Sequence, residues 1–180
     1  MKLLISQIAD GENRLGFNSV RDVLVKKLME EIEKSDEGLR FSGPLQVDLN
    51  LTKLEPEYYL RGSLACEISQ NCARCAEANP FAVKFPFELG LAHIVHQKAK
   101  DPALTQESDV LDIIYFEGPE LDLAPILEEQ FFLGRPYQLV CKESCQGLCQ
   151  QCGANRNIEP CDCTQSMGLS PFSVLKQLKH

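Results

Sequence analysis

The sequence lacks the features of a membrane or secreted protein. It contains no apolar run of roughly 18 residues, the length at which a segment becomes a candidate to span a bilayer. Its first residues hold one lysine and then only Leu3, Leu4 and Ile5 before polar residues follow, whereas a signal peptide needs a longer apolar run. These absences predict a cytoplasmic protein without a membrane partner, in a compartment that keeps thiols reduced.

Positive charge is also scarce. The formal net charge is −8, which argues against a surface that coats nucleic acid in general. The charge is uneven, however, because residues 135–180 carry a net +2 and the rest carries −10. The C-terminal part is therefore the predicted nucleic-acid face, and the acidic remainder suits contact with a basic protein.

The residue patterns of enzymes are missing as well. The three histidines have no nucleophile at a suitable spacing, and neither a phosphate-binding loop nor a dinucleotide fingerprint is present. Glu128 and Glu129 are adjacent, so on a helix they point about 100° apart and do not converge on one atom. The sequence predicts a non-enzymatic protein and identifies no small-molecule substrate.

Cysteine, by contrast, is abundant and clustered. Six of the nine cysteines lie within the 23 residues of Cys141–Cys163. Cys149 and Cys152 are separated by two residues and followed by Gly153, which permits the positive φ of a tight metal-binding turn. Reduced, clustered thiols predict metal ligation more than disulfides, and an odd number of cysteines cannot pair within one chain.

Eight of the nine cysteines sort into four close pairs, enough for one or two zinc sites with four thiolate ligands each. One site would join the pair Cys72 and Cys75 to Cys141 and Cys145, and the other would use Cys149, Cys152, Cys161 and Cys163. A single site formed by Cys72, Cys75, Cys149 and Cys152 fits the spacing too. The alternatives are an iron–sulfur cluster or a thiol redox protein.

The hydrophobic pattern predicts an α+β fold. Alternating apolar residues over 45–51, 58–66 and 81–91, with a short apolar segment at Val110–Phe116, predict an antiparallel β meander of four or five strands, Cys66 being a core residue. Helices are expected over 19–34, capped by Asn18 or Ser19, and after Asp122 until Gly134, and a closing helix from Pro171. We expect a body over 1–136 and a Cys-rich, zinc-stapled segment over 137–180.

Several short motifs resemble those of the YceD family. They are Cys72-x-Arg-Cys75, Glu120-Leu-Asp-Leu with Glu128-Glu129, Leu133-x-x-Pro136, Gly147-Leu-Cys-x-x-Cys-Gly153 and Pro171-Phe-x-Val-Leu-x-x-Leu178. The resemblance covers roughly residues 45–180 in order. Many family members lack much of the C-terminal cysteine block, and the common form has proline where this chain has Gln150.

The resemblance implies a role in large-subunit ribosomal RNA accumulation, with metal binding and nucleic-acid contact. The expected partner is ribosomal RNA or a basic ribosomal protein. A segment held together by zinc would present four cations to phosphates, namely Arg74, Arg135, Lys142 and Arg156.

Overall fold

The computed structural model describes residues 1–54, 57–94 and 113–163. In this part of the chain the elements are, in order, β1 (Lys2–Leu4), the 3-10 helix η1 (Ile5–Gln7), β2 (Gly11–Asn18), α1 (Val23–Ser35), β3 (Arg40–Phe41), β4 (Gln46–Leu54), β5 (Glu57–Asn71), β6 (Ala78–His93), β7 (Ile113–Phe116), β8 (Glu120–Asp122) and α3 (Leu123–Gly134). The predicted α+β class is confirmed.

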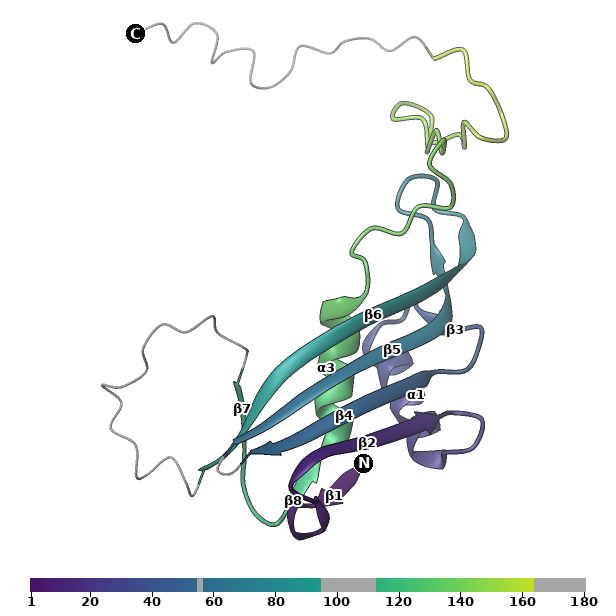
Figure 1. Ribbon diagram of the computed structural model, residues 1–180. Coiled ribbons are helices and arrows are strands. Elements are labelled where there is room, and N and C mark those ends of the chain that lie inside the picture. Colours follow the sequence, from purple (N-terminus) through teal and green to yellow (C-terminus); the bar gives the residue numbers. More distant parts are fainter. Residues whose placement is uncertain (55–56, 95–112, 164–180) are drawn as a thin grey trace, which may run out of the picture.

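A curved sheet forms the main layer of the molecule (Figure 1). Its strand order is β2-β4-β5-β6-β7, and β3 pairs with the end of β5. β1 and β8 form a separate two-stranded sheet. The long hairpin of β5 and β6 keeps its register from Glu57 opposite Ala92 to Asn71 opposite Ala78, so its tip extends beyond the end of β4.

The meander is antiparallel from β2 to β6, as the alternation predicts, but β7 pairs with β6 in parallel. The antiparallel direction expected for this last strand was wrong. Alternation reports which face a residue occupies and not the direction of the strand, and a parallel partner needs a crossover rather than a tight turn. β2 and β3 were not predicted.

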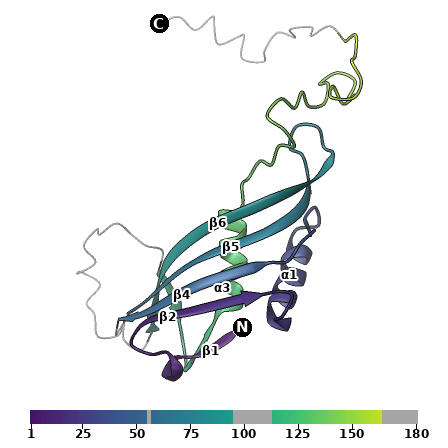
Figure 2. The ribbon, with the colours of Figure 1, turned by 45° about the vertical axis from the view of Figure 1, so that its right-hand side comes forward.

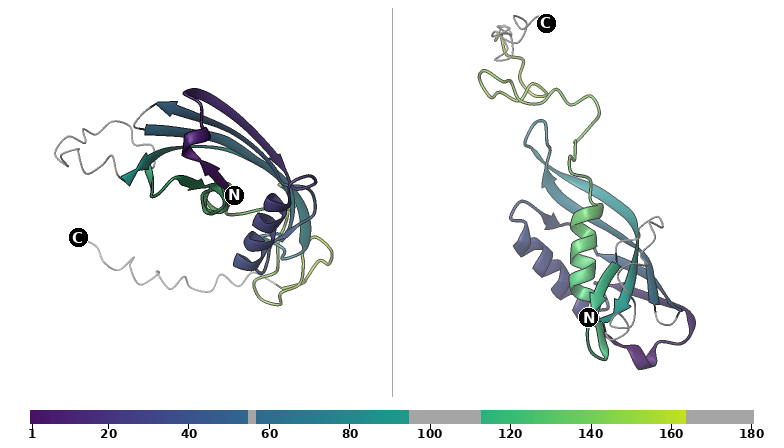
Figure 3. Two further views of the ribbon diagram at one scale, coloured as in Figure 1. Left: turned by 90° about the horizontal axis from the view of Figure 1, so that it is seen from below. Right: turned by 90° about the vertical axis from the view of Figure 1, so that its left-hand side faces the viewer.

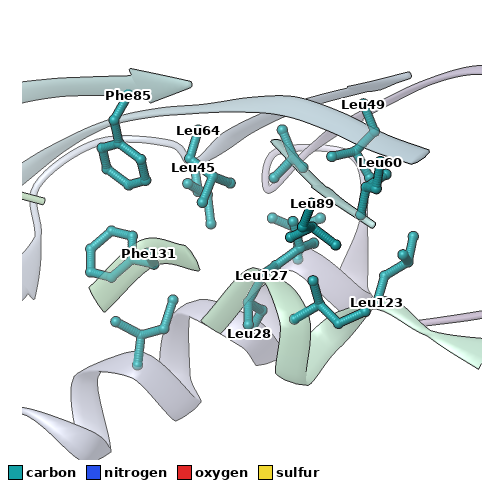
Figure 4. Packing of buried hydrophobic residues seen from close by; sticks show 14 of the residues in the cluster. Leu28, Leu45, Leu49, Leu60, Leu64, Phe85, Leu89, Leu123, Leu127 and Phe131 are labelled. Carbon is teal, nitrogen blue, oxygen red and sulfur yellow. The ribbon is translucent and has the colours of Figure 1, made fainter. Parts of the chain in front are cut away.

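Both described α-helices cover the same face of the sheet (Figure 3). Inward-facing residues of β4, β5 and β6 are buried there against both helices (Figure 4). The Phe131 ring is fully buried and lies 5.5 Å from the Phe41 ring and 6.0 Å from the Phe85 ring, centroid to centroid. Cys66 also belongs to this core, as predicted, and burial raises the pKa of its thiol to about 12.

The first long helix begins later than the sequence indicates. Asn18 and Ser19 do not cap it: the Asn18 side chain accepts from the Val20 N–H at 2.8 Å, and the Ser19 hydroxyl accepts from the Leu45 N–H at 3.0 Å. Asp22 stands at the N-cap position of α1 instead. The helical spacing of Val20, Val23, Leu24, Leu28 and Ile32 predicts that these five residues face the core. Leu28 and Ile32 are buried as predicted, whereas Val20, Val23 and Leu24 are exposed and Val25 is buried instead.

The second helix matches its predicted limits. The Asp122 carboxylate accepts from the Ala124 N–H at 3.1 Å, as an N-cap should, and α3 ends at Gly134. The apolar spacing predicts a buried side made of Leu123, Ile126, Leu127, Phe131 and Leu133. The first four are buried, but Leu133 is 68% exposed. Helix α3 packs along the sheet, and the chain that follows its C-terminal end reaches the tip of the β5–β6 hairpin (Figure 2).

Three expectations fall outside the described residues. They are the turn that the sequence predicts near Glu55-Pro56, the polar loop that it predicts over His96–Ser108 together with the start of the strand expected at Val110, and the closing helix expected from Pro171. The weak apolar alternation over Met1–Ile8 predicts an edge strand, of which Lys2–Leu4 forms β1 while Ile5–Gln7 forms η1. None of the described helices combines the length and the apolar character needed to cross a membrane.

Gly62 is expected to be essential for close packing in the sheet. A Cβ atom at this position would lie 2.5 Å from Phe87, 2.7 Å from Leu49 and 2.9 Å from the Asp48 carbonyl oxygen. Gly62→Ala should therefore lower the free energy of unfolding by about 1–3 kcal/mol in urea denaturation.

Gly16→Ala is the matched control, because Gly16 is also a strand glycine but its added Cβ would meet only the Asp48 Oδ1 atom at 3.8 Å. This variant should be as stable as the wild type or slightly more stable. Equal stability of the two variants would contradict the packing argument.

Candidate metal centres

Two groups of four cysteine sulfurs come together at and beyond the tip of the β5–β6 hairpin. The first tetrad consists of Cys72, Cys75, Cys141 and Cys145, and the second tetrad of Cys149, Cys152, Cys161 and Cys163. In each tetrad the four Sγ atoms lie within 4.8 Å of one another. The alternative grouping of Cys72 and Cys75 with Cys149 and Cys152 is therefore not formed in the described chain.

The first tetrad joins segments that are far apart in the sequence. Cys72 Sγ lies 3.9 Å from Cys145 Sγ, and Cys75 Sγ lies 3.8 Å from Cys141 Sγ. Four sulfurs held at ~2.3 Å around a tetrahedral metal ion are separated by about 3.8 Å from one another. The observed separations therefore fit four thiolate ligands of one ion.

The hairpin turn aims the first two sulfurs. The Cys72 N–H donates to the Glu77 carbonyl at 2.8 Å, and the Ala76 N–H donates to the Cys72 carbonyl at 2.9 Å. Ala76 adopts φ +59°, the left-handed conformation that closes this turn. A Cys-x-x-Cys pattern between two strands predicts a turn here, but it does not predict that alanine takes the left-handed position.

Backbone N–H groups point at the Cys72 sulfur. The Arg74 and Cys141 N–H groups each donate to Cys72 Sγ at 3.4 Å. Burial opposes ionisation of this thiol, but the backbone N–H donors outweigh it and lower the pKa of Cys72 to about 6. A thiolate, which is the form that binds metal, is thus favoured at this position.

A hydrogen-bond network outside the tetrad supports Cys145. The Asn157 side-chain amide donates to Cys145 Sγ at 3.4 Å, and its oxygen accepts from the Gln146 N–H at 2.9 Å. Groups that bond to metal ligands in this way orient them. Sequence reasoning missed Asn157, because a loop asparagine gives no signal that distinguishes this role.

The second tetrad is built within a single loop. The Cys149 N–H donates to the Ala154 carbonyl at 2.8 Å, and the Gly153 N–H donates to the Cys149 carbonyl at 2.9 Å. Gly153 has φ +74°, the positive value that the sequence predicted for this turn. Backbone N–H groups of Cys152 and Gln151 lower the pKa of Cys149 to about 6.

The two tetrads differ in exposure. Cys72 and Cys75 are each 3% exposed and Cys145 is 6% exposed, whereas Cys152 is exposed and the other cysteines of the second tetrad are half-buried. No open coordination position is expected at a metal ion with four thiolate ligands, so such sites are structural in type. Both tetrads can hold a metal ion.

Contacts at Gly147 and Arg74 attach the second tetrad's loop to the hairpin tip. The Leu148 N–H donates to the Arg74 carbonyl at 2.9 Å. Gly147 has φ +71°, and a Cβ there would lie 2.9 Å from the same carbonyl oxygen, so only glycine fits. The Asn155 amide also reaches the Glu77 carboxylate at 3.3 Å.

The four candidate phosphate-binding cations occupy unlike surroundings. The Arg74 guanidinium donates to the carbonyls of Glu143 and Cys145 at 3.1 and 3.2 Å, within the site. Arg135 pairs with Asp36 at 2.6 Å and is only 19% exposed, so it connects α3 to α1. Lys142 and Arg156 are exposed on the Cys-rich segment.

Comparison with known proteins identifies relatives. The family model described as "Large ribosomal RNA subunit accumulation protein YceD" matches residues 60–179. The chain is 24% and 27% identical to chloroplastic YCED homolog 1 proteins of Arabidopsis thaliana and Zea mays, over 74% and 72% of its length. It is 21% identical, over 68% of its length, to an uncharacterized protein of Mycobacterium leprae.

The chain spans about half the length of the curated relatives it matches, with 49%, 52% and 54% of those proteins covered. No solved structure matches the chain.

Substitution in the first tetrad should remove one metal ion per chain. Cys145→Ser replaces a thiolate by a weak ligand, so metal content measured on protein purified without chelators should fall by one ion, and the hairpin tip should become sensitive to protease. Cys66→Ala is the control, because Cys66 lies in the main hydrophobic core and outside both tetrads. Equal metal content in Cys145→Ser and wild type would contradict the assignment.

Proposed function

Because the chain belongs to the YceD family, whose model covers residues 60–179, we propose that it acts in the accumulation of large-subunit ribosomal RNA. The two plant relatives are named for this same role. We propose a binding protein and not an enzyme, with one zinc ion in each tetrad. Zinc suits sites of four thiolates better than harder cations do.

The observation that supports a binding role is the placement of the tetrads. They organise a loop-rich segment that has almost no buried apolar side chains of its own, at the end of the long β5–β6 hairpin. Four-thiolate zinc sites stabilise such segments and leave no position open for chemistry. The segment therefore presents a fixed surface to a partner.

We propose two contacts for this surface. Lys142 and Arg156 are the exposed cations available to phosphates of ribosomal RNA, because Arg74 and Arg135 already bond to groups of the protein. Residues outside 135–180 carry a net −10, which favours a basic ribosomal protein as the second partner. The reduced tetrads are consistent with a cytoplasmic location, which stays a prediction.

Loss of the protein should lower the amount of large-subunit ribosomal RNA relative to small-subunit RNA. In cells that lack the gene, wild-type protein and the Cys66→Ala variant should restore the ratio, whereas Cys145→Ser and Cys149→Ser should not. Quantitative electrophoresis of total RNA measures the ratio. Full restoration by both tetrad variants would show that the metal-organised segment is not needed.

RNA binding should depend on the two exposed cations of the Cys-rich segment. Lys142→Ala combined with Arg156→Ala should reduce the slope of log affinity against log salt concentration by about 2, roughly 1 for each phosphate that is no longer neutralised. Filter binding of large-subunit ribosomal RNA fragments over a salt series measures this slope.

Arg61→Ala is the matched control, because Arg61 is an exposed arginine of the sheet that pairs with Glu88 at 2.6 Å. It should leave the slope unchanged. An unchanged slope in the double variant would exclude RNA contact by this surface and favour the basic protein partner.

A further inference from the structure

The two tetrads differ in what protects them. In the first tetrad, Cys72 and Cys75 are 3% exposed, and Cys145 is covered by the Asn157 amide, which donates to its sulfur at 3.4 Å. In the second tetrad, Cys152 is exposed to solvent. Cys141 of the first tetrad is half-buried, and Cys152 is the one member of either tetrad that is exposed. A dissolved oxidant can therefore reach Cys152 directly and has less access to the sulfurs of the first tetrad.

The two tetrads also differ in the structure that supports their cysteines. The first tetrad lies where the hairpin packs against Val140, and its sulfurs come from segments up to 73 residues apart. Within the described residues 148–163, no side chain is buried. This loop has no core, so its fold depends on the metal ion, on a few backbone hydrogen bonds and on the side-chain hydrogen bonds of Asn155 and Asn157.

We propose that Cys152 is an oxidant-entry site, through which peroxide releases the metal ion of the second tetrad while that of the first stays bound. The inference rests on the metal binding proposed above. It assigns a modification site to the second tetrad and makes its loop a redox-sensitive unit, which hydrogen bonds attach to the hairpin tip.

The reaction balances with hydrogen peroxide as the oxidant. The Cys152 thiolate attacks one peroxide oxygen, the O–O bond breaks, and a sulfenic acid and hydroxide form. A neighbouring thiolate of the tetrad then attacks the Cys152 sulfur, a disulfide forms, and a second hydroxide leaves. The two hydroxides take up two protons to give water, and two sulfurs have been oxidised by one reduced peroxide.

One such step removes two of the four ligands of a zinc ion, and a second step joins the remaining two thiolates and frees Zn²⁺. A thiol reductant reverses both steps, since sulfenic acids and disulfides are reducible forms of cysteine. The zinc ion itself changes no oxidation state.

The test begins with the full chain loaded with zinc and counted for metal. Two zinc ions per chain before any oxidant are expected, and fewer than two would count against the proposed metal binding independently of oxidation. Hydrogen peroxide is then added with the coloured zinc chelator 4-(2-pyridylazo)resorcinol. We expect one zinc ion to be released roughly tenfold or more faster than the other, since oxidation follows thiolate exposure.

Mass spectrometry of peptides identifies the oxidised residues. After the fast phase, disulfides should lie among Cys149, Cys152, Cys161 and Cys163, and the cysteines of the first tetrad should remain alkylatable thiols. A reductant with added zinc should restore two ions per chain. Release of both ions in one phase, or earlier oxidation of Cys72 and Cys75, would overturn the proposal.

Two histidine variants distinguish oxidant entry at Cys152 from the simple loss of a metal ligand. Histidine can replace cysteine as a zinc ligand but is not oxidised to a disulfide. Cys152→His should slow the fast phase, whereas Cys75→His should leave it unchanged. If Cys152→His does not bind the second zinc ion, peptide analysis of the wild type still tests the proposal, because it shows which tetrad is oxidised first.

Discussion

The constraint on which the Cys-rich end depends is the crowding of sulfur atoms. Four Sγ atoms lie within 4.8 Å of one another in each tetrad, and four thiolates at such distances repel one another strongly. Without a cation, most of these thiols would have to stay protonated. The pKa values of Cys141 and Cys163 are about 12, whereas backbone N–H donors lower those of Cys72 and Cys149 to about 6. Desolvation is the main cause at Cys141, and hydrogen bonding with Cys152 is the main cause at Cys163. A divalent ion at the centre would relieve the repulsion and satisfy all four ligands.

The rest of the molecule serves to place these sulfurs. The sheet and its two helices form one apolar core, and the β5–β6 hairpin carries two cysteines beyond that core. Helix α3 returns the chain from the opposite end of the sheet to the hairpin tip, where the other two cysteines of the first tetrad follow. The first tetrad thus contains residues from both sides of the predicted boundary at 136–137, and that boundary remains a prediction.

Much of this arrangement could be predicted from local patterns. Long alternation identified β5 and β6, and the cap at Asp122 with the stop at Gly134 identified α3, because each pattern reports a local backbone preference. The start of α1 was misplaced because the Asn18 and Ser19 side chains bond to a turn and to Leu45 instead of a helix terminus. Local sequence carries no information about such distant partners.

The same limit applies to the site. Spacing paired the cysteines but left two groupings open, since which pairs meet depends on the path of α3 and not on the pairs themselves. The positions of Asn157, which bonds to a ligand sulfur, and of Arg135, which is paired with Asp36, depend on tertiary contacts as well.

The separation of 73 residues between Cys72 and Cys145 has a consequence for synthesis. At ribosomal rates of about 5–20 residues per second, the first dithiol leaves the ribosome roughly 4–15 s before its partners. For most of that interval the hairpin tip holds only two of the four ligands and α3 has not been made. Leu123–Gly134 is completed shortly before Cys141 follows. Completion of the first tetrad therefore coincides with completion of the body, so that capture of its metal ion marks a chain whose core has already been made.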